Sequence, residues 1–229
     1  MIKILLVEDD ESLGFMLQEN LNTDQWQVTW AKDGVRGLSS FRSDSFDICL
    51  LDVMMPHRDG YELAAEIRKY DQKVPLVFLT AKNQTQDRIK GFEVGADDYV
   101  TKPFSVTELK YRVEAILKRC NPRLDQNKTV QTLSVGQAKL DLDNLLLHIQ
   151  EQERQLTYKE ARVLQLFFQS PNQIITRQEF LEKIWQDDGF FVARSMDVFI
   201  SRIRKYLKPD DSLQIQNIRG VGYRLIAKN

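Results

Sequence analysis

The stretch Cys49-Leu50-Leu51-Asp52-Val53-Met54-Met55-Pro56 decides how this chain folds. The apolar run that leads into it ends abruptly at the carboxylate of Asp52. A short apolar run bounded by turn signals predicts a buried strand, and the pair Asp59-Gly60 predicts a turn just beyond it. Ligands of open parallel sheets bind at the carboxyl ends of the strands. We therefore expect Asp52 to be a metal ligand, a nucleophile, or both.

The first 120 residues repeat this pattern of an apolar strand followed by a helical period. Besides the strand that ends at Asp52, the sequence predicts strands at 2–7, 26–30, 74–79 and 99–101. Each is followed by apolar residues at helical spacing, including a helix marked by Ile89 and Phe92. Such alternation requires a parallel sheet with helices on both faces. The expected fold of residues 1–120 is a doubly wound α/β domain with five parallel strands.

The spacing of apolar residues changes after residue 120. Residues 121–129 contain Pro122 and almost no apolar side chains, which predicts a linker. Within 130–229, small antiparallel strands are predicted first. Capping boxes at Thr157 and Thr176 then open two helices, a third helix is predicted at 195–207, and a hairpin turns at Gly220-Val221-Gly222. This order predicts an α+β winged helix-turn-helix domain.

Composition and charge narrow the class of protein. The net charge is −1, but residues 1–120 carry 16 basic against 20 acidic side chains, whereas residues 121–229 carry 16 against 13. An acidic domain followed by a mildly basic one predicts different partners for the two. No apolar run is long enough to span a membrane or to form a signal peptide, so we expect a cytoplasmic protein without a membrane partner. Cys49 and Cys120 lack metal-ligand spacing and are expected to be free thiols.

Polar side chains follow four of the five predicted strands: Glu8-Asp9 the first, Asp52 the third, Thr80 the fourth and Lys102 the fifth. Strand ends of a parallel sheet lie on one edge, so these groups should meet. Converging carboxylates repel one another, and Mg2+ is suited to a few carboxylates with water and phosphate oxygens. A lysine and a hydroxyl can hold a phosphate. The set indicates a carboxylate that accepts a phosphoryl group.

Each motif also has an ordinary explanation when taken alone. Acid pairs at strand ends are commonly solvated turn residues, a Lys-Pro pair is commonly a turn, and Thr80 and Tyr99 are ordinary strand residues. Four motifs in order at four strand ends favour the functional interpretation.

Residues 1–120 resemble the receiver domain of two-component response regulators. The matching stretches are Leu6–Asp10, Leu51–Pro56, Asp59-Gly60, Leu79–Ala81 and Gly95–Phe104. The resemblance implies a flavodoxin-like fold in which Asp52 is the phosphoacceptor, able to lose its phosphoryl group again by self-catalysed hydrolysis but with no other enzymatic activity.

The same resemblance implies roles for the neighbours of Asp52. Mg2+ is expected on Asp9 directly, on Glu8 through water, on Asp52, and on the backbone carbonyl of Met54. Lys102 is expected to contact the phosphoryl group and to precede Pro103 through a cis bond. Thr80 and Tyr99 match a switch pair that moves on phosphorylation.

A charged face is expected near the fourth helix and fifth strand, and it consists of Arg88, Asp97, Asp98, Glu108, Arg112 and Arg119. Such a face can simply be solvated, because exposed ion pairs contribute little. The resemblance implies instead a symmetric homodimer in which Arg88 pairs with Glu108, Asp98 with Arg112 and Asp97 with Arg119 across subunits. We favour the dimer.

Residues from about 130 to 227 resemble the effector domain of the OmpR/PhoB subfamily, on the stretches Leu156–Glu160, Ile184-Trp185, Arg194–Val198, Ile203–Lys205 and Ile218–Arg224. The helix at 195–207 has one apolar face and a second, polar face suited to the major groove. The residues expected at DNA are Arg194 on a phosphate, Ser201, Arg202, Arg204 and Lys205 on the helix, and Arg219 in the minor groove.

Two features depart from the pattern. Phe199 stands where relatives often have a polar residue; if exposed it could contact a thymine methyl, and if turned inward it belongs to the core. The acidic and aromatic segment Asp187–Phe191 either shapes the loop before the DNA-reading helix or contacts a partner such as RNA polymerase.

The expected function is transcription regulation, in which a cognate sensor histidine kinase phosphorylates Asp52 and phosphorylated dimers bind promoter DNA at direct repeats. One alternative is a relay protein whose second domain binds protein. Another keeps DNA binding without control by phosphorylation, against which the complete acid set and Lys102 argue.

Overall fold

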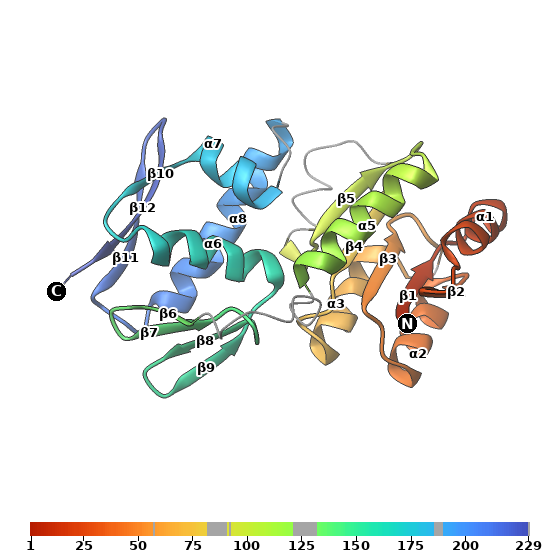
Figure 1. Cartoon of the computed structure of the whole chain (residues 1–229), viewed down its shortest axis with the longest axis horizontal. Helices are drawn as coiled ribbons and strands as arrows, with labels where there is room; N and C mark the ends of the chain where they lie inside the picture. The colour runs from red at the N-terminus through yellow and green to blue at the C-terminus, as the bar shows by residue number, and fades with distance from the viewer. Residues whose placement is uncertain (57, 82–90, 92, 121–131, 186–189, 229) are drawn as a thin grey trace. The chain divides into compact units, whose positions relative to one another are not determined.

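The computed structural model describes residues 1–56, 58–81, 91, 93–120, 132–185 and 190–228, with the backbone alone at 119, 120, 185 and 190–195. The chain divides into two compact units, Met1–Leu124 and Asp125–Asn229 (Figure 1). None of the helices in the described part of the chain is long and apolar enough to span a membrane.

The first unit is a five-stranded parallel sheet in the order β2-β1-β3-β4-β5. Its described elements are β1 (Ile2–Val7), α1 (Glu11–Leu21), β2 (Trp26–Ala31), α2 (Gly34–Ser43), β3 (Ile48–Asp52), α3 (Gly60–Tyr70), β4 (Leu76–Thr80), β5 (Asp98–Thr101) and α5 (Val106–Cys120). This confirms the doubly wound α/β fold. The predicted helix markers Ile89 and Phe92 lie outside the described residues.

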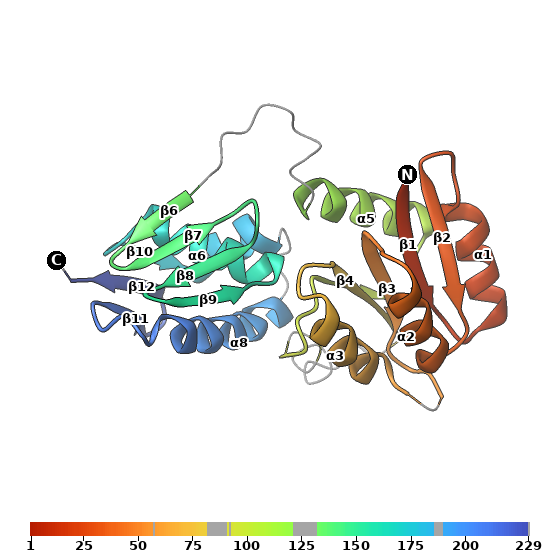
Figure 2. The ribbon, with the colours of Figure 1, turned by 90° about the horizontal axis from the view of Figure 1, so that it is seen from below.

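The sheet of this unit is covered on both faces. Helices α1 and α5 lie on one face and α2 and α3 on the other (Figure 2). One buried cluster joins strand side chains such as Leu6 and Leu50 to Leu17 of α1 and Val113 of α5. All five residues of β3 are buried, as two covered faces require. Cys49 in β3 is fully buried, and this burial raises the pKa of its thiol.

The second unit contains two antiparallel sheets and a helical layer, which confirms the α+β class. The sheets run β6-β7-β8-β9 and β10-β12-β11. Its described elements are β6 (Thr132–Val135), β7 (Ala138–Asp141), β8 (Leu146–Ile149), β9 (Gln152–Gln155), α6 (Tyr158–Gln169), β10 (Ile174–Thr176), α7 (Arg177–Phe180), the π-helical turn Leu181–Trp185, α8 (Phe190–Leu207), β11 (Leu213–Ile218) and β12 (Gly222–Ala227).

Both predicted capping boxes are present in the second unit. Thr157 and Glu160 bond reciprocally at the start of α6, and Thr176 and Glu179 do the same at the start of α7. The predicted hairpin is formed by β11 and β12. Helix α8 begins at Phe190 rather than at 195, because no glycine or proline interrupts residues 190–195. The entirely polar strand β9 carries no apolar alternation and was not predicted.

Candidate functional site

Three carboxylates meet at the carboxyl edge of the parallel sheet. Glu8 follows β1 and Asp52 ends β3, and these two strands are neighbours in the sheet. Glu8, Asp9 and Asp52 each bring a carboxylate oxygen to within 4.8 Å of the others. Glu8 is fully buried and Asp52 nearly so, whereas Asp9 is half-buried. Because like charges at this spacing repel, the cluster requires a positive counterpart.

Lys102, which follows β5, brings one positive charge into the cluster. Its Nζ donates to both carboxylate oxygens of Glu8, at 2.9 and 2.8 Å, and to Oδ2 of Asp52 at 2.8 Å. The bond from Lys102 to Pro103 is cis, as predicted. Burial raises the pKa of Glu8 to about 7, and the negative charge of Asp52 adds to that rise, while the bond from Lys102 opposes it. One ammonium therefore leaves this cluster of three carboxylates under-neutralised.

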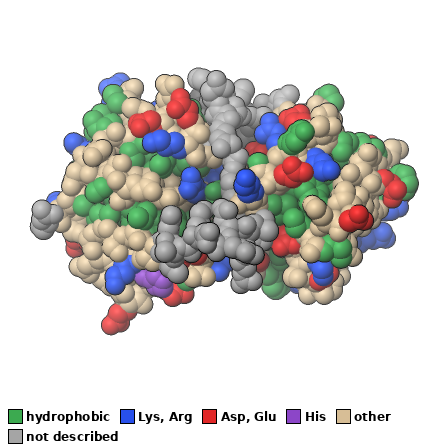
Figure 3. All heavy atoms as spheres, in the orientation of Figure 1, with side chains coloured by type: hydrophobic (Ala, Val, Ile, Leu, Met, Phe, Trp, Pro, Cys, Tyr) green, Lys and Arg blue, Asp and Glu red, His purple; other side chains and the backbone are tan. Residues whose placement is uncertain are grey.

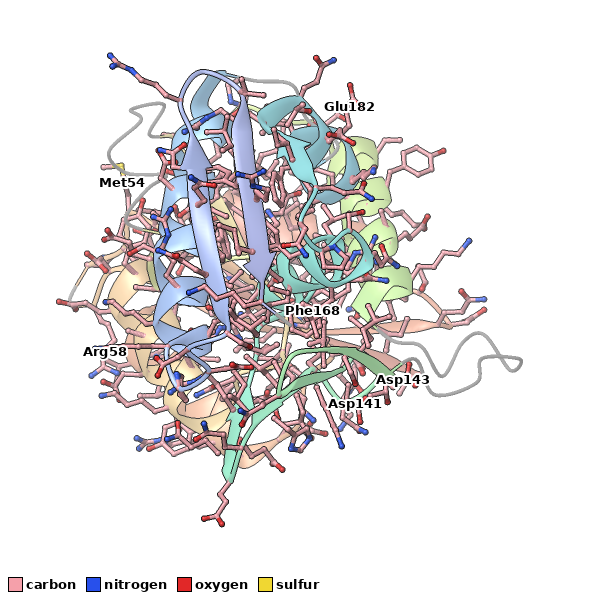
Figure 4. The ribbon with its side chains drawn as sticks, turned by 90° about the vertical axis from the view of Figure 1, so that its left-hand side faces the viewer. Met54, Arg58, Asp141, Asp143, Phe168 and Glu182 are labelled. Carbon is pink, nitrogen blue, oxygen red and sulfur yellow. The ribbon has the colours of Figure 1, made fainter. Side chains whose placement is uncertain are left out.

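The cluster fits a hard divalent cation. Its donors are carboxylate oxygens from two adjacent strand ends, which is the ligand chemistry that Mg2+ prefers. Met54 lies beside them, and its backbone N–H donates to Oδ1 of Asp52 at 3.1 Å. The Met54 side chain is 54% exposed and projects away from the ribbon (Figure 4), so only its backbone lies against Asp52.

Thr80 and Tyr99 lie on neighbouring strands next to this edge. Thr80 is fully buried at the end of β4, and its carbonyl accepts a bond from the Lys102 backbone N–H at 2.8 Å. The ring of Tyr99 is turned inward, 8% exposed and 5.2 Å from the ring of Phe78. A Cβ on Gly91 would overlap the Tyr99 hydroxyl, so the glycine makes room for the inward ring.

Asp97, which is expected on the dimer face, makes contacts within its own unit. Asp97 is 6% exposed, and its Oδ2 accepts from the Leu76 backbone N–H at 2.9 Å and from Arg68 at 3.2 Å. Arg68 of α3 also donates to the carbonyls of Val74 and Gly95. The carboxylate therefore joins the connections around β4 and β5 within the unit, and its pairing with Arg119 of another subunit stays a prediction.

The other members of the expected dimer face are only partly described. Arg112 donates to Glu108 at 3.0 Å and approaches Asp98 at 3.4 Å, both within the same chain. These groups are partly exposed, so the same atoms can also meet a second copy. Arg88 and the side chain of Arg119 lie outside the described residues.

Two residues expected to read DNA are turned toward the interior of the second unit. Phe199 is fully buried, so the inward alternative holds and a contact with a thymine methyl is wrong. Arg202 is not free on the polar face of α8; it donates to Glu160 of α6 at 3.2 Å, and its side chain is 22% exposed. The hydroxyl of Tyr206 donates to the same Glu160 oxygen at 3.0 Å. A buried carboxylate on the neighbouring helix thus holds Arg202.

The other described residues that are expected to contact DNA are exposed, namely Ser201, Arg204, Lys205 and Arg219. Arg204 donates through Nε to the carbonyl of Ile215 at 3.1 Å, which leaves the outer guanidinium nitrogens for other contacts. In Figure 3, Lys and Arg side chains of each unit lie interspersed with acidic ones. The side chains of Arg194 and Asp187–Phe191 lie outside the described residues.

A polar cluster that the sequence did not reveal joins the hairpin to α8. Arg177 donates to Asp197 at 3.2 Å and to the Tyr223 hydroxyl at 2.8 Å, and this hydroxyl donates to Asp197. Burial and the bond to Asp197 raise the pKa of Tyr223 to about 12. The three residues lie 20 to 46 positions apart in the chain, so no local spacing could reveal them.

Comparison with known proteins identifies the family. Residues 4–114 match the model of the response regulator receiver domain, and residues 151–225 match that of the C-terminal domain of transcriptional regulatory proteins. Transcriptional regulatory protein RprY of Bacteroides fragilis is 44% identical over 98% of this chain and 94% of its own. The chain is a two-component response regulator of the OmpR/PhoB type.

Further relatives agree with this assignment. The alkaline phosphatase synthesis transcriptional regulatory protein PhoP of Bacillus subtilis is 34% identical to the regulator, over 97% of the regulator and 96% of PhoP. The solved structure of a RitR mutant covers 100% of both chains with a TM-score of 0.73; at 23% identity, it shows the fold alone.

The regulator is thus a DNA-binding transcription factor of a two-component system and not a catalytic enzyme. The prediction of a DNA-binding second domain is confirmed, and the protein-binding alternative is excluded as its main role. Membership of this family implies a sensor kinase and DNA as partners.

Proposed function

We propose that Asp52 accepts a phosphoryl group from the histidine of a cognate sensor kinase in the cytoplasm. An Oδ atom of Asp52 forms the new P–O bond while the P–N bond to the imidazole breaks, and the freed nitrogen is protonated. The observation that carries the proposal is the Lys102 Nζ at 2.8 Å from Asp52 Oδ2, beside two further carboxylates. An ammonium in that place can transfer its bonds to the oxygens of the arriving phosphoryl group.

Mg2+ completes the proposed site. Asp9, Asp52 and the backbone carbonyl of Met54 would bind it directly and Glu8 through water, and the ion would supply positive charge to the oxygens of the phosphoryl group. Its presence would also free Lys102 from the excess of negative charge in the cluster. Thr80 would donate its hydroxyl to the phosphoryl group, and the ring of Tyr99 would follow that movement.

The test of this site is phosphorylation of the full chain by acetyl phosphate with Mg2+, followed by intact-protein mass. One phosphoryl group, labile in base, is expected on the wild type. Asp52→Asn should abolish it, whereas the exposed control Asp24→Asn should label like the wild type. Equal labelling of Asp52→Asn would refute the assignment.

We further propose that phosphorylated receivers form a homodimer that sets two α8 helices on a direct-repeat promoter site. The residues that would contribute to the dimer are Arg88, Asp97, Asp98, Glu108, Arg112 and Arg119. Ser201, Arg204 and Lys205 would face the major groove, Arg194 a phosphate, and Arg219 the minor groove. The exposure of these described side chains on α8 and the hairpin supports this assignment.

Selection of binding sites by purified variants separates these DNA contacts. Lys205→Ala and Arg219→Ala should alter the selected sequence at one position or in its A·T-rich flank, at a cost of about 1–3 kcal/mol for a base contact. Arg194→Ala should weaken all sites alike and lower the salt dependence. Binding that is identical with and without phosphorylation would favour DNA binding that is independent of Asp52.

A further inference from the structure

Trp30, on β2, is bonded to the backbone of the acidic cluster. Its indole Nε1–H donates to the carbonyl oxygen of Glu8 at 2.9 Å. The Glu8 backbone N–H is bonded in turn to the carbonyl of Ala31, at 3.1 Å. Both sides of the Glu8 backbone are therefore attached to the same neighbouring strand, which lies beside β1 (Figure 2).

Gly14 provides the space in which this indole lies. It sits in the second turn of α1, where a glycine costs roughly 0.5–1 kcal/mol relative to alanine. A Cβ at this position would overlap the five- and six-membered rings of Trp30. Lys32 lies over the Trp30 ring, with its Nζ 5.3 Å from the ring centroid, and is bonded to Glu11 of α1 at 2.7 Å. The ring is thus held between the helix and the lysine.

The bonded carbonyl belongs to the peptide group that joins Glu8 to Asp9. A peptide group is planar, so fixing its oxygen restricts the direction in which the chain leaves toward Asp9. One residue later, Asp10 caps α1 by accepting from the backbone N–H groups of Ser12 and Leu13, at 2.9 and 3.0 Å. Asp9 therefore lies between two anchored points, the indole on one side and the cap on the other.

We propose that Trp30, in the space left by Gly14, is a positioning residue that holds the Glu8–Asp9 peptide so that both carboxylates converge on Asp52. The inference rests on the proposed Mg2+ site, which these carboxylates would form. Trp30 does not touch the ion or the phosphoryl group. It acts by limiting how far the two acids can turn away from each other, and a hydrogen bond that orients ligands in this way affects metal affinity.

The test is the dissociation constant for Mg2+, measured by calorimetry on the full-length protein. Trp30→Phe keeps an aromatic ring but loses the N–H donor. Gly14→Ala keeps Trp30 but displaces its ring. The matched control is Trp26→Phe, on the same strand, whose ring lies in the core with Lys110 5.8 Å from its centroid. Asp9→Asn marks the loss of a direct ligand.

We expect Trp30→Phe and Gly14→Ala each to weaken Mg2+ binding by about three- to tenfold, the range expected for loss of one orienting hydrogen bond. Their combination should weaken it no further, because both remove the same bond. Trp26→Phe should keep the wild-type affinity even where its melting temperature falls. An unchanged affinity in Trp30→Phe, or an equal loss in Trp26→Phe, would overturn the inference alone. A wild type that binds no better than Asp9→Asn would overturn the proposed metal site, and the inference with it.

Discussion

Two of the described clusters in which a cation meets carboxylates, one in each unit, differ in charge balance. In the second unit, Glu160 is a single carboxylate bonded to Arg202 and Tyr206 through one oxygen and to the backbone of Thr157 through the other. In the described part of the receiver, Lys102 donates to Glu8 and Asp52, and Asp9 is the third carboxylate of that cluster. The first cluster pairs one carboxylate with one guanidinium, and both oxygens of Glu160 accept hydrogen bonds. The second retains excess negative charge and can bind another cation.

This difference separates a structural cluster from a reactive one. A carboxylate paired with one guanidinium has little net charge to attract a cation, and this pair joins α6 to α8. An under-neutralised cluster has a free energy that falls when a metal ion enters, so its charge is available for chemistry. Burial raises the pKa of Glu8 to about 7, and the negative charge of Asp52 adds to that rise.

The largest effect is expected from breaking the cluster at Glu160. Glu160→Ala leaves Arg202 without its buried partner and removes half of a capping box, which should cost about 3–5 kcal/mol of unfolding free energy. Denaturant unfolding of the second unit is the measurement. Glu182→Ala, on the exposed turn after α7, should change it by less than about 0.5 kcal/mol. Phosphorylation of Asp52 should be unaffected in both, and a small loss in Glu160→Ala would show that the cluster is not a structural unit.

Removing Lys102 from the cluster at Asp52 should affect phosphorylation, which the change at Glu160 should leave unaffected. Lys102→Ala should lower the rate of phosphorylation by acetyl phosphate about 10²- to 10³-fold, by analogy with loss of one donor at a developing negative charge. It should also tighten Mg2+ binding, because the ion no longer competes with the ammonium. Lys110→Ala on α5 serves as the control. Unchanged kinetics in Lys102→Ala would mean that the lysine only solvates the acids.

A substitution beside Tyr99 tests whether its inward position matters. Gly91→Ala should force the ring outward or strain the site, at a cost of about 1–3 kcal/mol. The double variant with Tyr99→Ala should lose less than the sum of the two single changes, because the overlap disappears. Thermal unfolding of the receiver gives both values, and strict additivity would contradict a direct contact.

The smallest effect on the stability of the isolated subunit is expected from substitution of Arg112 on the charged face. Arg112→Ala removes partly exposed pairs with Asp98 and Glu108, which should change monomer stability by less than about 1 kcal/mol. If the same residues join two receivers, sedimentation of the phosphorylated protein should show a weakened dimer. A dimer equilibrium equal to that of the wild type would leave Arg112 with its partners inside the subunit only.

The two clusters also show what the sequence could predict. Strand ends are fixed by topology, so Glu8, Asp52 and Lys102 could be brought together from the order of apolar runs alone. On α8, the spacing of residues along the helix did not show which side chains are exposed. Arg202 looked exposed because its partner lies 42 residues earlier in the chain, and Phe199 could be placed only by packing. The contact of Asp97 with Arg68 could not be predicted for the same reason, since Arg68 precedes it by 29 residues.

The burial of Cys49 makes its thiol a probe of how often the receiver opens. The thiol lies three residues before Asp52 on a strand paired with β1 and β4, it is fully buried, and its pKa is raised. Reagents that need a thiolate therefore cannot reach it in the folded protein. In a variant with Cys120 replaced by serine, the rate at which Cys49 is alkylated would measure how often the central strand becomes exposed.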